Sequence, residues 1–202
     1  MSDTITRLII QGDDDHIEAF INAVKGDTNL DFYKILPIPF EIKYTIYPVK
    51  MISEEKYKQL WHAWLSRKKL GRLLDHESKL PKIGMTISQY DYLMDKYGYT
   101  NWCEWSIGTY GTKSGAYHVG EWCIGNEQAT IEYTTLWSPA SEFYINVSKL
   151  FPDLIFKHEF FDDYDVYIGN ETIVNGQIID SNDLIYNCEK AMLLKQSFKK
   201  ID

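Results

Sequence analysis

Along the first part of the chain, the hydrophobic residues have first the pattern of a β-strand, then the spacing of a helix, and then the pattern of a strand again. Residues 5–11 form a short apolar run, which predicts a buried strand that ends at Gly12. Apolar residues then recur at helical spacing over 17–24, after three aspartates that favour a helix N-terminus. Residues 30–36 predict another strand, so this part of the chain predicts one β-α-β unit.

The later part of the chain shows the same order of periods. Residues 128–137 alternate between apolar and polar side chains, as a strand does when one face is buried. Ser138 and Pro139 predict the start of a helix, because proline suits the first helical position. Residues 154–160 alternate again and predict the next strand, which completes a second β-α-β unit.

Two further elements follow the second unit. Residues 166–179 predict a β-hairpin that turns at Asn175-Gly176, a dipeptide suited to the positive φ angles of a two-residue turn. The remaining segment, 180–202, predicts a C-terminal helix with polar ends.

Residues 50–98 have a helical pattern and separate the two β-α-β units. Helices are predicted near 53–69 and 86–98, with Ser53 as an N-cap and Gly98 as a C-terminal stop. We expect the two helices to pack together through large apolar side chains, namely Trp61, Trp64, Tyr90 and Met94.

The order of elements predicts an α+β fold with a ferredoxin-like antiparallel sheet and helices on one face. We expect a single domain over 1–202, with a helical insertion at 50–98 and a C-terminal helix at 180–202. The two β-α-β units should share one sheet.

Composition narrows the class of protein. The 202 residues are 45% hydrophobic and 15% aromatic, which suits a folded core and argues against disorder. The net charge of −8 works against non-specific binding to nucleic acid or to an anionic membrane. Three cysteines without a CxxC pair, no signal peptide and no apolar run of membrane-spanning length favour a cytoplasmic protein.

Known catalytic and metal-binding motifs are missing from the sequence, so we expect no cofactor, no metal and no catalytic residue. A P-loop needs glycine where Thr112 precedes Lys113. His158 shares a strand face with two phenylalanines and is interpreted as a core or edge histidine. The acidic turn formed by Asp162, Asp163 and Asp165 lacks the spacing of a calcium loop, but it is a candidate acidic patch.

The stretch NWCEWSIGTYGTKSGAYHVGEW, residues 101–122, allows two interpretations. In the structural interpretation it is a bent part of the sheet whose glycines mark bulges or turns. Trp102, Trp105 and Trp137 are then core side chains. In the functional interpretation an exposed binding patch is formed by Tyr110, Gly111, Thr112, Lys113, Tyr117 and Trp122, because aromatic and cationic side chains are frequent at binding hot spots.

Several of these motifs together resemble the YubB-like ferredoxin-like-domain family. The resemblance rests on Asn101-Trp102 and Gly111-Thr112-Lys113, on Leu136-Trp137-Ser138-Pro139, and on Phe151-Pro152-Asp153-Leu154. Here Tyr110 and Ser114 replace the tryptophans that flank the family's GTK motif. The resemblance implies the ferredoxin-like fold, a phage or plasmid origin and a place in the bacterial host cytoplasm, but no reaction.

We therefore expect a non-enzymatic binding protein of a phage or other mobile element that acts on a host protein. A defence system is one such target, and the acidic surface would then mimic nucleic acid. The alternative is a small-molecule or nucleotide binder, or an enzyme, that uses a cleft between the sheet and the helical insertion. Direct binding of nucleic acid is disfavoured by the negative charge.

Overall fold

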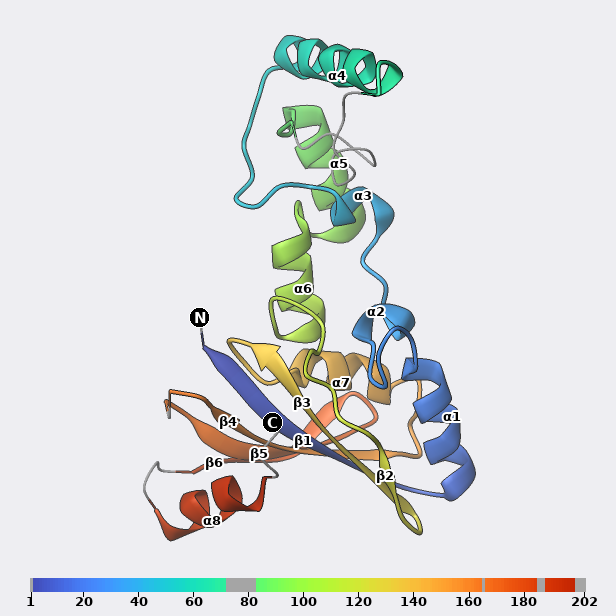
Figure 1. Cartoon of the computed structure of the whole chain (residues 1–202), viewed down its shortest axis with the longest axis vertical. Helices are drawn as coiled ribbons and strands as arrows, with labels where there is room; N and C mark the ends of the chain where they lie inside the picture. Colours follow the sequence, from blue (N-terminus) through green and yellow to red (C-terminus); the bar gives the residue numbers. More distant parts are fainter. Residues whose placement is uncertain (1, 72–82, 165, 185–187, 199–202) are drawn as a thin grey trace. The chain divides into compact units, whose positions relative to one another are not determined.

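The computed structural model describes residues 2–71, 83–164, 166–184 and 188–198. The chain divides into two compact units, whose elements are labelled in Figure 1. Unit 1 contains Met1–Pro37 and Ser106–Asp202, and unit 2 contains Ile38–Trp105. The helical insertion predicted at 50–98 lies within unit 2.

Unit 1 contains a six-stranded antiparallel sheet with the strand order β2-β3-β1-β4-β5-β6. The strands are β1 (Asp3–Gln11), β2 (Cys123–Ile124), β3 (Gln128–Leu136), β4 (Ile155–Asp162), β5 (Ile168–Val174) and β6 (Gln177–Asp183). The predicted α+β class and the ferredoxin-like antiparallel sheet are confirmed. Leu8 of the central strand lies opposite Ile131 of β3 and His158 of β4, so strands from both β-α-β units pair in one sheet.

Helices α1 (Asp14–Val24) and α7 (Ser141–Ser148) cover one face of this sheet. Phe20 of α1 and Tyr144 of α7 both contact Phe156 of β4, with ring centroids 5.2 and 5.8 Å apart. Alternate residues of β1 are buried on this face, as is usual for a strand with one covered face, whereas the sequence predicted this strand from a short apolar run. The main core of unit 1 therefore lies between the sheet and these two helices.

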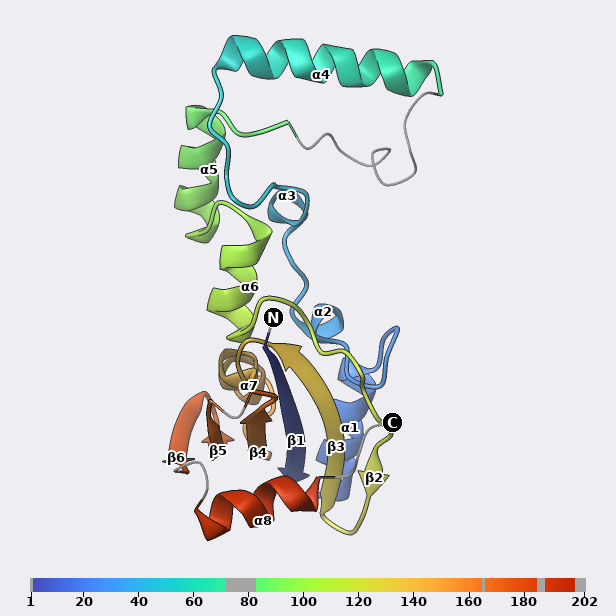
Figure 2. The ribbon, with the colours of Figure 1, turned by 60° about the vertical axis from the view of Figure 1, so that its left-hand side comes forward.

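The C-terminal helix, α8 (Glu189–Ser197), lies on the other side of the sheet from α7, as Figure 1 shows. Its end is held by Arg7 of β1, which donates to Ser197 Oγ at 2.9 Å and lies 4.4 Å from the ring centre of Phe198. Figure 2 shows α8 in front of the strands in a second view. The helix is shorter than predicted, because 180–183 belong to β6.

Two segments predicted as strands are helical. Residues 30–36 contain the short helix α2 (Phe32–Ile35), whose N-cap Asp31 accepts a hydrogen bond from the Tyr33 N–H at 2.9 Å. The ring of Phe32 stacks on Phe143 with centroids 3.8 Å apart. This cap and this core contact outweigh the strand preference of a short apolar run.

The first part of 101–122 forms the helix α6 (Trp102–Tyr110), not a bent strand. Asn101 begins it, because its side-chain oxygen accepts hydrogen bonds from the N–H groups of Cys103 and Glu104 at 3.1 and 3.0 Å. The helix ends where Gly111 adopts a φ of 78°, which favours glycine. The boundary between the two units falls within this helix, after Trp105.

Unit 2 contains α3 (Phe40–Lys43), α4 (Glu54–Lys69), α5 (Ile87–Tyr97) and the start of α6. Ser53 caps α4, as predicted, by accepting the Lys56 N–H at 3.2 Å. Thr86 and Gln89 form a capping box at the start of α5, and Gly98 ends it with a φ of 72°.

The predicted packing residues of these two helices differ in burial. Trp64 of α4 is buried, but Tyr90 and Met94 of α5 are exposed by 38% and 41%. The buried side chain of α5 is Leu93 instead. Packing through Tyr90 and Met94 is therefore wrong, because these side chains point to solvent.

The hairpin of β5 and β6 turns at Asn175-Gly176, as predicted. Both residues have positive φ angles, 45° and 80°, and Val174 pairs with Gln177 across the turn. The Gly176 N–H also donates to Ser148 Oγ of α7 at 2.8 Å. The hairpin is thus fastened to the helix that covers the sheet.

Candidate functional site

The predicted binding patch does not form one exposed surface. Tyr110 is fully buried, and its hydroxyl donates to the Leu36 carbonyl at 2.5 Å. Burial raises its pKa above the ordinary range. Thr112 is also buried and donates to the Leu136 carbonyl at 2.6 Å, because the chain folds back on β3 after Gly111. The exposed placement of Tyr110 and Thr112 was therefore wrong.

The other patch residues lie at different points along β3. The Tyr117 hydroxyl donates to Asp3 Oδ1 at 2.5 Å, and burial together with this carboxylate raises the pKa of Tyr117. Trp122 is half-buried, donates from Nε1 to the Asn29 carbonyl at 3.0 Å and meets Phe20 edge-on. Both side chains have structural partners, which a sequence pattern cannot show.

Trp137, predicted as a core residue, is exposed by 39% and has a φ of 77°. Its N–H donates to the Ser2 carbonyl at 3.0 Å, and its carbonyl accepts the Tyr167 hydroxyl at 2.9 Å. The Lys113 ammonium lies 4.6 Å from the centre of its ring, within cation-π distance. The turn after β3 therefore holds this indole partly outside the core.

The other two predicted core tryptophans belong to unit 2. Trp105 is buried, with 9% exposure, and Trp102 is half-buried against Tyr47, with ring centroids 6.4 Å apart.

The predicted acidic patch is mostly a structural turn. Asp162 is buried, and its Oδ1 accepts the N–H groups of Tyr164 and Val166 at 2.9 and 3.1 Å. Asp163 is exposed and accepts the Asp3 N–H at 2.9 Å. Asp165 lies outside the described residues. Asp162 is therefore removed from any acidic surface.

Three hydrogen-bonded side chains, His158 of β4, Glu171 of β5 and Ser141 of α7, connect these elements. His158 is fully buried, as expected of a core histidine, and its Nε2 lies 2.8 Å from Glu171 Oε2. The Ser141 hydroxyl donates to the same oxygen at 2.7 Å. Burial opposes ionisation of Glu171, but these two partners outweigh it and lower its pKa. The serine donates to the carboxylate, so this arrangement lacks the nucleophile-base contact of a catalytic triad.

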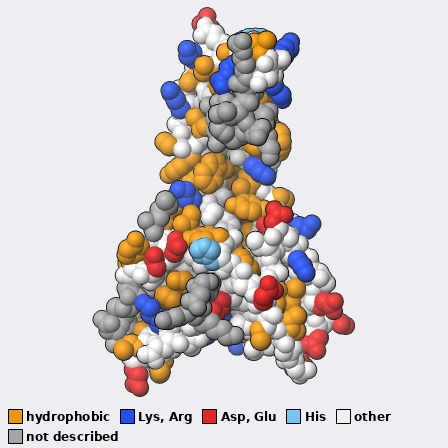
Figure 3. Space-filling model, in the orientation of Figure 1, with side chains coloured by type: hydrophobic (Ala, Val, Ile, Leu, Met, Phe, Trp, Pro, Cys, Tyr) orange, Lys and Arg blue, Asp and Glu red, His pale blue; other side chains and the backbone are white. Residues whose placement is uncertain are grey.

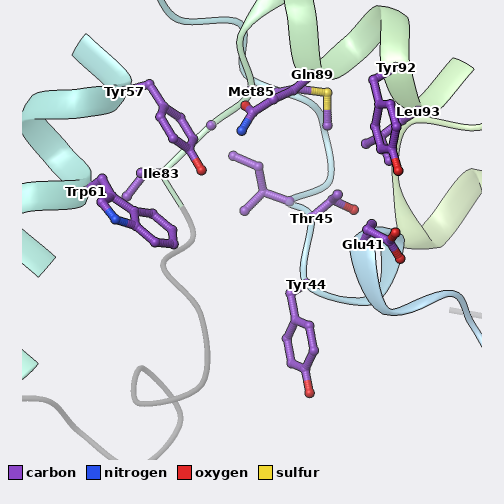
Figure 4. A pocket seen from close by; sticks show the side chains of 12 residues that line it. Glu41, Tyr44, Thr45, Tyr57, Trp61, Ile83, Met85, Gln89, Tyr92 and Leu93 are labelled. Carbon is purple, nitrogen blue, oxygen red and sulfur yellow. The ribbon is translucent and has the colours of Figure 1, made fainter. Parts of the chain in front are cut away.

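Unit 2 contains a pocket of about 260 Å³, which Figure 4 shows from close by. Four of its twelve described lining residues are aromatic, and two of them, Tyr57 and Trp61 of α4, stack with ring centroids 6.0 Å apart. Figure 4 shows this pair on one side of the pocket and Tyr92 with Glu41 on the other. Met85 lies between the two sides, and Ile83 lies beside Trp61.

Several polar side chains in the pocket wall have partners within unit 2. Glu41 forms an ion pair with Lys96 at 2.9 Å, and the hydrogen bond from Lys96 lowers the pKa of this carboxyl. Gln89 caps α5 through the Thr86 N–H at 3.0 Å. Thr45 accepts the Trp102 N–H at 3.1 Å and donates to the Ile42 carbonyl at 2.7 Å. These contacts order part of the wall, and the rest of the lining is mainly aliphatic and aromatic.

The sequence contained only part of the signal for this pocket. Tyr57 and Trp61 stand four residues apart on one helical stripe, which was interpreted as packing surface. Tyr44 and Tyr92 share no periodic pattern with them and come from separate segments. The pocket residues were missed because folding, and not sequence spacing, brings them together.

Large apolar side chains are exposed around the elements of unit 2. Their exposures range from 38% to 69%, and they are Phe40, Tyr47, Met51, Leu70, Ile87, Tyr90, Tyr92 and Met94. Figure 3 shows some hydrophobic side chains, among Lys and Arg side chains, on the visible face of this part of the chain. Exposed apolar surface of this kind is typical of binding sites.

Charge is divided unevenly between the two units. Unit 1 has 10 Lys and Arg against 21 Asp and Glu, a net charge of −11, whereas unit 2 has 11 against 8, a net charge of +3. The acidic character of the chain therefore belongs to unit 1 alone.

The described residues contain no group of three or more His, Cys, Asp or Glu side chains placed to hold a metal ion. Within the same residues, every helix is too short or too polar to cross a membrane.

Comparison with known proteins supports the fold of unit 1. None of the curated proteins matches the chain. The chain is similar to the crystal structure of a protein api92 from Yersinia pseudotuberculosis, with a TM-score of 0.51 and 12% identity, over 92% of this chain and 98% of that one. Residues 117–197 match a family described as "Ferredoxin-like domain in Api92-like protein". This segment, from the approach to β2 through α8, is therefore similar to the ferredoxin-like domain of Api92-like proteins.

Proposed function

We propose that the chain is a binding protein without enzymatic activity, which engages a protein partner through unit 2. The observation that carries the proposal is the mainly apolar pocket of unit 2 together with the exposed large apolar side chains of the same unit. An interface of this kind gains its free energy from burying rings and aliphatic side chains. Exposed apolar groups such as Met51 and Met94 have no stabilising role in solvent.

The arrangement of polar side chains supports binding more than catalysis. Ser141 and His158 both hydrogen-bond to the carboxylate of Glu171, in an order unsuited to activating a nucleophile. In the pocket, Glu41 is neutralised by Lys96. Binding through shape and apolar contacts does not require Glu171, His158 or Glu41 to gain or lose a proton.

The proposed biological setting rests on the resemblance to the YubB-like family. We propose that a phage or plasmid carries the gene and that the partner is a host protein in the bacterial cytoplasm, such as a defence component. Mimicry of nucleic acid would use unit 1, whose net charge is −11. Burial of Asp162 reduces the support for mimicry at the predicted acidic turn.

The second candidate is a small-molecule binder, including a nucleotide binder or an enzyme. The pocket supports it, because its size of about 260 Å³ approaches that of ligand sites. All the described residues that line this pocket belong to unit 2.

Site-specific photocrosslinking in host cells tests the proposed function. A photoreactive residue at Met51 or Tyr92 should capture a defined protein that the matched position Tyr164 of unit 1, exposed by 66%, does not capture. Capture should survive nuclease treatment. Equal capture at all three positions, or loss of the product with nuclease, would refute a protein partner at unit 2.

A further inference from the structure

We infer that the unit 2 pocket receives one uncharged aromatic side chain from the protein partner, with indole as the best fit. This inference rests on the proposed function for the source of the side chain. It concerns the chemistry of the site, which can be tested without the partner.

The size of the pocket limits the ligand to about one side chain. An apolar cavity of about 150 Å³ holds a single benzene molecule. The pocket, at about 260 Å³, is larger than this and suits a two-ring group such as indole. A dinucleotide or a folded element would exceed this volume.

The shape of the wall favours a flat ring. Tyr57 and Trp61 are nearly parallel, with 17° between their planes, so together they form a continuous aromatic wall. Trp64 packs against Trp61, with ring centroids 5.5 Å apart. Tyr92 lies across the pocket in Figure 4, so a ring between the walls meets aromatic surface on both sides.

The lining offers little to a charged ligand. Glu41 is the one charged side chain among the described residues that line the pocket. The described lining therefore contains no cationic side chain to bind a phosphate group. Lys96 already supplies the cation that this carboxylate needs, at 2.9 Å, so a ligand ammonium would have to displace it. A neutral ring meets neither obstacle.

The surroundings of the pocket fit a ring carried by a polypeptide. Met51 and Tyr92 are exposed by 47% and 51%, and Tyr92 also lines the pocket. Segments 50–52 and 83–85 are joined by a bridge between Met51 and Met85 and by the Ile52 N–H to the Met85 carbonyl at 2.9 Å. Residues that flank the inserted side chain can therefore pack on apolar groups next to a fixed backbone.

The test uses the full chain and the probe N-acetyl-L-tryptophanamide, observed by two-dimensional amide NMR. The probe should shift the amide signals of Gly84, Met85 and Leu93, and N-acetyl-L-alaninamide should not. Thymidine monophosphate and choline serve as the nucleotide and cation probes. Trp61→Ala should weaken binding of the tryptophan probe about tenfold, the scale of one lost aromatic contact.

Two variants guard against loss of folding. Ile46→Trp fills the pocket from its own lining and should abolish the shifts while the other amide signals persist. Tyr164→Ala, in unit 1, should bind the probe as the unchanged chain does. Stronger pocket shifts with thymidine monophosphate or choline than with the tryptophan probe would overturn the inference, and so would the absence of shifts.

The two proposals fail separately. If the tryptophan probe binds but crosslinking at Met51 or Tyr92 captures no protein, the pocket chemistry stands and the proposed function falls. If crosslinking captures a protein but the probe does not bind, the inference about the ring is wrong and the proposed function stands.

Discussion

Trp137 shows how a single residue can combine an unfavourable backbone with an exposed ring. A φ of 77° is costly for a bulky side chain, and this side chain is exposed by 39%. The cost is offset by hydrogen bonds to Ser2 and Tyr167 and by Lys113 over the ring. The turn therefore depends on its neighbours, and the indole contributes little core packing.

At position 137, the glycine variant should be more stable than the alanine variant, which reverses the usual order of stability. We expect Trp137→Gly to be about 1 kcal/mol more stable than Trp137→Ala, because glycine adopts a positive φ without the steric cost. Urea unfolding of the two variants measures the difference. Trp105→Ala, at a buried position, should cost about 3–5 kcal/mol as a comparison. A more stable alanine variant at position 137 would contradict this account.

Glu171 should make stability depend on pH in the acid range. Burial disfavours its ionised form, but His158 and Ser141 lower its pKa overall. A carboxyl with a lowered pKa adds stability above its unfolded-state value of about 4.3 and loses that contribution as pH falls through the folded-state value. Between about pH 5 and pH 3, the unchanged chain should therefore lose stability more steeply than Glu171→Gln. Urea unfolding across this range measures both slopes, and equal slopes would refute the role of Glu171.

At the scale of elements, a helix cap can decide whether a segment forms a helix when its hydrophobic pattern is ambiguous. Asn101 begins α6 by accepting two N–H groups. Asn101→Ala should destabilise the helix by about 1 kcal/mol, seen as faster hydrogen exchange of the α6 amides. Asn126→Ala, at an exposed position, is the matched control and should change little. Unchanged exchange in α6 would show that packing alone holds the helix.

The strands were predictable wherever one face is buried and the other is not. β3 and β4 have this property, and their alternation predicted their positions, whereas β1 was predicted from a short apolar run. The hairpin was predictable from Asn175-Gly176 because few dipeptides adopt its φ angles. α2 and α6 were missed because their preference for helix comes from one cap each and from tertiary contacts.

At the scale of the whole chain, unit 1 should keep its fold when most of unit 2 is removed. The main aromatic core, which includes Phe20, Phe32, Phe143 and Phe156, lies entirely in unit 1. Deleting 50–98 should therefore leave a folded sheet that unfolds cooperatively on heating, followed by near-ultraviolet circular dichroism. Loss of the aromatic signal at all temperatures would show that the insertion belongs to the folding core of unit 1.

The candidate site was less predictable than the fold, for a physical reason. A strand or helix repeats its pattern along the sequence, but the pocket gathers Tyr44, Trp61 and Tyr92 from three separate elements or loops. The sequence did indicate large apolar residues in 50–98. It could not indicate that Tyr92 would remain exposed by 51% at the pocket.

The hairpin turn also affects the rate at which Asn175 deamidates. An Asn-Gly pair deamidates when the glycine nitrogen attacks the asparagine side-chain carbonyl and closes a succinimide ring. Here the Gly176 N–H is engaged with Ser148 Oγ at 2.8 Å, and the hairpin fixes the backbone at Asn175. Asn175 should therefore deamidate at the rate at which the hairpin opens, and Ser148→Ala should accelerate it. Peptide mass spectrometry during storage measures this, with Ser66→Ala as the control, and equal rates in the two variants would mean that the Ser148 hydrogen bond gives Asn175 no protection.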